Sequence, residues 1–369
     1  MIKIHKLAPS VISQIAAGEV VERPASIIKE LLENSIDAGA KEIKIRMFEG
    51  GIDLIEIQDN GSGVSEEDLE GMISHHATSK MKTLEDLYSI FTFGFRGEAL
   101  SSIASVSKLS IWSKTEDENG FEAQVIEGKI QSVQPKPRNQ IGTTIRVEGL
   151  FKNIPARRKF LKSVRTETNH IYKVFEDFAL AYPSISFELE SNGVKTKTLT
   201  PQSPIERISS VWPSSVAEDF IPIEYNGKDI QIKGYIIHPH TSFSRLKYAK
   251  IFVQNRPIHS NLIHKAITDG YDTMLEVRKF PAYIVKITLD PKSVDVNVHP
   301  RKMEVKFEDE RCIYKTIRSL VSTSLQKQHI ESMSPSTQNF STGDTKESPT
   351  SPSFELRQEK FFKNIQQNN

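Results

Sequence analysis

Apolar and polar positions follow a helical period in residues 23–39, RPASIIKELLENSIDAG. At about 100° per residue, one broad face collects the mostly apolar side chains of Ile27, Ile28, Leu31, Leu32, Ser35 and Ile36. On the opposite side, Glu30, Asn34 and Asp37 fall within about 60° of each other. A proline suits the first helical turn, and a glycine suits the position just past the end. The pattern predicts an amphipathic helix whose narrow polar stripe holds a carboxylate, an amide and a carboxylate.

The following segments alternate between strand and helix patterns. Alternating apolar residues predict strands over residues 43–47 and 52–58, joined at a Gly-Gly turn. Ser65 is the expected N-cap of a helix with acidic residues in its first turn. After a glycine-rich loop and a further helix, strands are expected over residues 108–113, 122–126 and 143–148. This order predicts an α+β layer sandwich around an antiparallel sheet.

A second α+β domain is predicted in the later part of the chain. Strands are expected over residues 186–190, 229–237, 250–254, 282–289, 293–298 and 304–307, and helices over residues 204–211, 261–275 and 311–326. The domains are therefore placed at residues 1–205 and 206–328. Residues 329–369 are too polar to bury enough apolar surface against the entropy of ordering, so we expect a disordered, linker-like tail.

The composition limits the classes of function. The chain has 369 residues and a formal net charge of +1, so any binding to nucleic acid depends on local patches and not on an overall field. The single cysteine, Cys312, excludes an internal disulfide and a cysteine-based zinc site. No apolar run reaches about eighteen residues, and the N-terminus lacks the apolar core of a secretory signal. A cytoplasmic protein that does not bind membranes is the default expectation.

Two glycine-rich motifs follow the first helix, DNGSG at residues 59–63 and GFRGEAL at residues 94–100. Neither the GxxxxGK[ST] P-loop nor a GxGxxG after a strand occurs, so a phosphate site must be built in another way. Gly94 and Gly97 would let backbone N–H groups approach phosphate oxygens at the start of the next helix. The helix and the two motifs are specific in combination.

A set of segments resembles the N-terminal part of the MutL family of DNA mismatch repair proteins. They are EVVERPASIIKELLENSIDAGA, DNGSGV, HHATSK, GFRGEALSSIASV, GTTIRV, NIPARRKFL and VDVNVHPRKMEVKF. The resemblance covers about residues 1–325 and implies a GHKL ATPase domain, a Bergerat-type α/β sandwich. The same superfamily includes type II topoisomerase ATPase subunits, Hsp90 and histidine kinases. A ribosomal-S5-like α+β transducer domain is implied after it.

The resemblance assigns roles to individual residues. Glu30 takes the place of the general base that activates water for attack on the γ-phosphate of ATP. Asn34 matches the ligand of Mg²⁺, a hard cation that prefers oxygen donors. Asp59 matches the carboxylate that accepts a hydrogen bond from the adenine amino group. Further ATP contacts are implied at Gly61, Gly63, Thr78, Lys80, Gly94, Phe95, Arg96, Gly97 and Thr143. Lys302 matches a lysine that reaches from the second domain to the γ-phosphate and stabilises charge there.

The segment of residues 152–173 carries seven Lys or Arg residues against one Glu. A solvated helix face would account for such a run. The resemblance implies that it binds DNA phosphates through Arg157, Arg158, Lys159 and Lys162, with Arg256 as a further candidate. Binding of this kind is independent of sequence and depends on salt.

Relatives in this family continue into a C-terminal dimerisation domain, which we expect to be absent here together with the DQHAxxE-type endonuclease motif. Self-association is therefore expected only on ATP binding, and no nuclease activity is expected. The other implied partners are a mismatch-recognition protein of the MutS type and a downstream nuclease or helicase. Residues 358–362, QEKFF, resemble a peptide that binds a sliding clamp.

The sequence thus predicts a slow, Mg²⁺-dependent ATPase that couples mismatch recognition to later repair steps through ATP-dependent pairing and DNA binding. Two alternatives remain open. ATP could act only as a gate for a binding module whose turnover is not required. The chain could also be another GHKL machine, such as a topoisomerase subunit, although NIPARRKFL and VDVNVHPRK favour the repair function.

Overall fold

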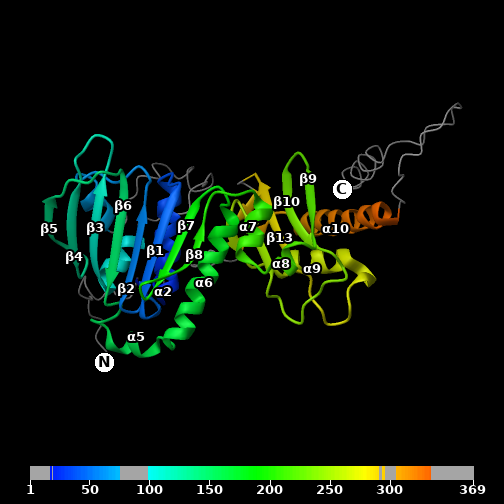
Figure 1. The fold of residues 1–369 in the computed structure, drawn as a ribbon, viewed down its shortest axis with the longest axis horizontal. Coiled ribbons are helices and arrows are strands. Elements are labelled where there is room, and N and C mark those ends of the chain that lie inside the picture. The colour runs from blue at the N-terminus through cyan, green and yellow to red at the C-terminus, as the bar shows by residue number, and fades with distance from the viewer. Residues whose placement is uncertain (1–16, 19, 75–98, 291–292, 296–304, 334–369) are drawn as a thin grey trace, which may run out of the picture. The chain divides into compact units, whose positions relative to one another are not determined.

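The computed structural model of the chain describes residues 17–18, 20–74, 99–290, 293–295 and 305–333. Residues 1–327 form one compact unit, and residues 328–369 form a second, of which only the end of the last helix is described. The first unit contains two large β-sheets and one two-stranded sheet (Figure 1). The mixture of helices and sheets confirms the predicted α+β class.

Eight strands form the first sheet, in the order β5-β4-β3-β6-β2-β1-β7-β8. They are β1 (Glu42–Phe48), β2 (Leu54–Asp59), β3 (Lys108–Lys114), β4 (Phe121–Ile126), β5 (Lys129–Pro135), β6 (Gly142–Glu148), β7 (Ser186–Ser191) and β8 (Val194–Leu199). Neighbouring strands are antiparallel except β1 and β7, which run parallel with Ile45 opposite Leu189. The strands expected to form an antiparallel sheet do so, and β7, which was expected in the second domain, joins them parallel to β1 and makes the sheet mixed.

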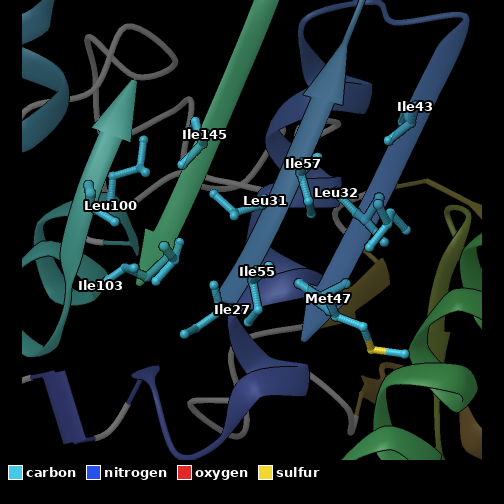
Figure 2. Packing of buried hydrophobic residues seen from close by; sticks show 14 of the residues in the cluster. Ile27, Leu31, Leu32, Ile43, Met47, Ile55, Ile57, Leu100, Ile103 and Ile145 are labelled. Atoms are coloured by element: carbon cyan, nitrogen blue, oxygen red, sulfur yellow. The ribbon is translucent and has the colours of Figure 1, made fainter. Parts of the chain in front are cut away.

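An apolar core is shared by this sheet and the helices α2 (Pro24–Asp37), α3 (Leu69–Ile73), α4 (Ala99–Val106) and α6 (Val164–Ala181). Figure 2 shows Ile27 and Leu31 of α2 beside Ile55 and Ile57 of β2. The predicted first helix is confirmed: it has a proline in its first turn and ends just before Gly39, whose φ is +76°. The apolar face of α2 is therefore committed to the sheet, and its polar stripe lies away from this core.

The second sheet has five strands in the order β12-β11-β13-β10-β9. They are β9 (Phe220–Asn226), β10 (Ile230–Ile237), β11 (Ala249–Val253), β12 (Arg256–Ile258) and β13 (Tyr283–Leu289). Helices α9 (Asn261–Tyr271) and α10 (Glu310–Met333) share a core with it, and α10 follows the short pair β14 (Val294–Asp295) and β15 (Lys306–Phe307). A third apolar cluster joins α7 (Pro204–Val211) and α8 (Ser214–Ala217) to β13 and to the end of α6. This cluster connects the two parts of the unit, so the predicted boundary at residue 205 stays a prediction.

Several elements differ from the sequence-based expectation. The helix expected to start after Ser65 is the shorter α3 (Leu69–Ile73), although the Ser65 hydroxyl accepts from the backbone N–H of Asp68 at 3.1 Å, as an N-cap does. Strands β5, β8, β9 and β12 were not predicted. In β8 all residues but the last are exposed, so an edge strand of this kind carries no apolar alternation.

The guanidinium of Arg207, on α7, is fully buried where the first sheet meets the second part of the unit. It donates to the side-chain amide oxygen of Gln202 and to four backbone carbonyls, at distances of 2.7 to 3.2 Å. The carbonyls are those of Ala179, Pro183, Ile185 and Thr200. Since a buried arginine is tolerated only when its donors are satisfied, this set of acceptors fixes the end of α6 against α7.

We predict that Arg207→Met lowers the free energy of unfolding by about 2–4 kcal/mol, because it leaves several buried carbonyls without a donor. The exposed Arg245 provides the matched control. Thermal unfolding followed by circular dichroism should show a clear drop in Tm for Arg207→Met and almost none for Arg245→Met. Equal Tm values for the two variants would contradict this role of Arg207.

Candidate functional site

Asp59 lies at the end of β2, and three protein donors hold its carboxylate. Oδ1 accepts from the backbone N–H groups of Gly61 at 2.9 Å and Thr143 at 3.3 Å, and Oδ2 accepts from the hydroxyl of Ser35 at 3.0 Å. Burial raises the pKa of the Asp59 carboxyl above its ordinary value of 3.8, although these hydrogen bonds act in the opposite direction. A carboxylate offers about four acceptor positions, so the described donors leave one on Oδ2 for a ligand.

The loop after Asp59 passes close to two other parts of the backbone. A Cβ atom at Gly63, whose φ is +75°, would lie 2.1 Å from the carbonyl oxygen of Lys114 on β3. At Gly61, a Cβ atom would lie 2.8 Å from the Cβ of Ala38 at the end of α2. Both glycines are therefore required by the packing of this loop. Their expected contacts with ATP stay a prediction.

The helix α2 contacts Asp59 through Ser35. Glu30 and Asn34 are one turn apart on this helix, and the Glu30 side chain is 22% exposed. Ser35 stands about 7.5 Å beyond Glu30 along the helix axis. Because its hydroxyl donates to Asp59, α2 is fixed against the end of β2. The fold thus brings Asp59 to Thr143 and to Ser35 of α2. The roles of Glu30 and Asn34 beside them stay predictions.

Two polar residues of this site were missed from the sequence. Ser35 was counted with the apolar face of its helix, and only its position within a turn of Asn34 could have drawn attention to it. Arg138 lies in the loop before β6, where no periodic pattern exists. Its guanidinium donates to the carbonyl of Trp112 at 2.6 Å and to the hydroxyl of Thr144 at 2.9 Å, and its charge lowers the pKa of Asp59.

Other predicted contacts lie outside the described residues. They are Thr78, Lys80, Gly94, Phe95, Arg96, Gly97 and Lys302. The clamp-like segment at residues 358–362 is also outside the described part of the chain. These assignments stay predictions.

The predicted DNA contacts fall on α5 (Pro155–Phe160) and on the connection to α6. Lys159 and Lys162 are exposed, and Arg158 is partly exposed with its guanidinium 3.5 Å from a carboxylate oxygen of Asp53. Arg157 differs, because its guanidinium lies over the ring of Phe151 at 5.3 Å and its Nη1 is buried. The cations that face solvent here are therefore Arg158, Lys159 and Lys162.

Arg256 does not lie on an open surface. It begins β12 and is only 6% exposed. Burial lowers its pKa, and the carboxylates of Glu33 and Asp37 on α2 oppose that effect. The side chain is thus within electrostatic reach of the acidic side of α2, and its assignment as a DNA contact stays a prediction. Nothing in the local sequence indicates that Arg256 comes within reach of this helix.

A nucleotide with Mg²⁺ fits the residues that the structure describes. The remaining acceptor position on Asp59 suits an amino group, and Asn34 supplies a neutral oxygen. No group of three or more His, Cys, Asp or Glu side chains in the described ranges could hold a metal ion. Mg²⁺ usually takes one or two protein oxygens and completes its shell with phosphates and water. In the same described ranges, no helix is long and apolar enough to cross a membrane.

Two family models match the chain. Residues 22–155 match the model described as "Histidine kinase-, DNA gyrase B-, and HSP90-like ATPase". Residues 208–326 match the model described as "DNA mismatch repair protein, C-terminal domain". The first matched range contains α2, β2, the loop of residues 60–63 and β6. The second matched range contains the five strands of the second sheet.

The curated relatives that match the chain are named DNA mismatch repair protein MutL. The chain is 40% identical over 363 residues to the DNA mismatch repair protein MutL of Shouchella clausii, covering 98% of this chain and 55% of that protein. It is 43% identical over 321 residues to the MutL protein of Staphylococcus aureus strain Newman, covering 86% of this chain and 48% of that protein. The chain therefore spans about half the length of the curated relatives it matches.

Solved structures support the fold. The N-terminal domain of a DNA repair protein matches with a TM-score of 0.72 at 27% identity, over 86% of this chain and 99% of that domain. The Aquifex aeolicus MutL ATPase domain complexed with ADP matches with a TM-score of 0.59 at 25% identity, over 82% of this chain and 98% of that domain. The predicted GHKL fold and the resemblance to MutL proteins are confirmed. The predictions of an ATPase and of a nucleotide cofactor agree with these matches.

We predict opposite effects of Asp59→Asn on stability and on ligand binding. Because burial raises the pKa of Asp59, its charge costs stability at neutral pH, and a neutral isostere should raise Tm. The gain should be full above the raised pKa and should vanish as pH falls below the ordinary value of 3.8, where the carboxyl is neutral in the folded and the unfolded chain. The same variant should lose binding of adenine nucleotides, measured by calorimetry. Retained ATP affinity would contradict the assignment of Asp59 to the base.

Proposed function

The chain is homologous to DNA mismatch repair proteins of the MutL type, and from that premise we propose that it binds and hydrolyses ATP to drive a repair cycle. The observation that carries the proposal is the arrangement around Asp59. A buried carboxylate with one acceptor position left, on the sheet side of a helix that carries Glu30 and Asn34, suits an adenine nucleotide with its phosphates along that helix.

Glu30 is the residue that we assign to the chemical step. Its carboxylate takes a proton from water as the water oxygen forms a bond to the γ-phosphorus. The bond from this phosphorus to the bridging oxygen breaks, and ADP and phosphate leave. A positioned general base of this kind contributes about 10²–10⁴ in rate.

Asn34 and Lys302 complete the assignment around the phosphates. The side-chain oxygen of Asn34 would hold Mg²⁺, which neutralises phosphate charge when bound. Lys302 would contact the γ-phosphate from the second part of the chain and stabilise the charge that develops there. Thr78, Lys80 and the segment from Gly94 to Gly97 would enclose the nucleotide.

The wider repair role follows from the relatives. We propose that ATP binding pairs two copies of this region, that hydrolysis separates them, and that a mismatch-recognition protein and a downstream nuclease or helicase use this cycle. The match of residues 208–326 to a mismatch repair model favours repair over a topoisomerase function. The exposed cations Arg158, Lys159 and Lys162 would bind DNA phosphates without sequence preference.

We predict that Glu30→Gln separates binding from hydrolysis. The variant should keep ATP affinity within about threefold and should lose roughly 10²–10⁴ in kcat, because the amide cannot accept the proton. Calorimetry and a phosphate-release assay measure the two quantities. Repair activity that survives in a variant without hydrolysis would favour ATP as a gate, and unchanged kcat would remove Glu30 from the chemical step.

A second prediction concerns DNA. The double variant Lys159→Glu/Lys162→Glu should weaken DNA binding equally for unrelated sequences and lower the slope of log K against log salt by about two. The exposed Lys315 on α10 supplies a control, Lys315→Glu, with the same change of charge. Fluorescence anisotropy at several salt concentrations measures both effects. An unchanged slope in the double variant would exclude this face.

A further inference from the structure

Lys29 contacts two carboxylates on its own helix. Its Nζ lies 3.2 Å from Oε1 of Glu30 and 2.8 Å from Oε1 of Glu33. The Glu33 side chain is 4% exposed, so its pair with Lys29 is shielded from water, whereas Lys29 and Glu30 are partly exposed. Burial lowers the pKa of Lys29, and the carboxylates of Glu33 and Glu30 raise it by more, so the ammonium group stays charged.

Glu33 is buried although it lies on the polar side of α2. Arg256 of β12, itself 6% exposed, lies within electrostatic reach of Glu33, and β12 contacts α6, which packs beside α2. The neighbouring strand β11 is fixed to α6 by Lys250, whose Nζ lies 2.9 Å from a carboxylate oxygen of Glu176 and 2.6 Å from one of Asp177.

We infer that Lys29 is a positioning residue for Glu30, and that Arg256 of the second sheet acts on this position through Glu33. The inference rests on the proposed role of Glu30 in activating water. Glu33 fixes the ammonium of Lys29, and this ammonium holds the Glu30 carboxylate. Hydrolysis thereby depends on Arg256 of β12, whose charge acts on Glu33.

The spacing on the helix explains why a cation is needed here. Glu30 and Glu33 are three positions apart, where side chains are neighbours and like charges repel. Lys29 lies between the two carboxylates and offsets this repulsion. Without it, the Glu30 carboxylate turns away from Glu33, and a displacement of about 1 Å at a reacting group costs about a hundredfold in rate. An ion pair that only adds to surface stability would leave turnover unchanged.

The test compares steady-state ATP hydrolysis by Lys29→Met, Lys29→Arg and the exposed-lysine control Lys315→Met. We expect Lys29→Met to lower kcat roughly ten- to a hundredfold with KM for ATP changed by less than about threefold. Lys29→Arg keeps the charge and should restore most of kcat, and Lys315→Met should behave as the unaltered chain. An unaltered kcat in Lys29→Met overturns the inference.

A double-variant cycle tests the route through Glu33. Arg256→Gln should lower kcat in the same direction, and its effect should largely disappear in the Lys29→Met background, because both act through one pair of carboxylates. Additive effects of the two substitutions on kcat would contradict the proposed action of Arg256 through Glu33. If Lys29→Met does not bind ATP, the inference is tested by the other two variants: kcat should be nearly normal in Lys29→Arg and lowered in Arg256→Gln. An unaltered kcat in Arg256→Gln would then contradict the inference.

The failure of the proposed function is recognised separately. Glu30→Gln is measured beside these variants, and normal hydrolysis by it would remove Glu30 from the chemistry whatever Lys29 does. Loss of hydrolysis in Glu30→Gln together with normal kcat in Lys29→Met would leave the proposed function intact and overturn only the positioning role.

Discussion

The buried carboxylate of Asp59 is the contact on which the arrangement of the first sheet and its helix depends. It joins the end of β2 to α2 through Ser35, to the following loop through Gly61, and to the start of β6 through Thr143. Burial disfavours a charge at this point, and the three donors offset part of that cost. The polar stripe of α2 is therefore held in one place relative to the sheet, so that a nucleotide bound at Asp59 would meet the same Glu30 and Asn34 each time.

The second sheet is connected to this site by charged groups. In addition to Arg256 and Lys250, Lys286 of β13 donates to the carbonyl of Ala181 at the end of α6, at 2.6 Å. Burial lowers the pKa of Lys286 to about 8. Each of these cations meets an acidic group or a helix-terminal carbonyl, which is a favourable place for positive charge. These polar contacts stand beside the apolar cluster of α7, α8, β13 and the end of α6, which also joins the two parts.

Local patterns were sufficient for much of this structure and insufficient for its long-range contacts. The first helix, with its proline, its terminal glycine and its polar stripe, could be predicted because all its signals lie within residues 23–39. The interaction of Arg256 with Glu33 could not be predicted, since nothing in either segment indicates that the two come within reach of each other. Ser35 was correctly placed on the apolar face of its helix, but its contact with Asp59 was missed because that face also reaches the end of β2. Strand β8 was missed because an exposed edge strand has no apolar alternation to detect.

Nucleotide discrimination tests the central claim most directly, which is that Asp59, Glu30 and Asn34 form one adenine-nucleotide site. Adenine offers an amino donor where guanine offers a carbonyl acceptor, and the acceptor position left on Asp59 can satisfy only the donor. Equilibrium titrations with ATP and GTP in the presence of Mg²⁺ should show binding of ATP that is tighter by about a hundredfold or more. Equal affinities for the two nucleotides would contradict the account.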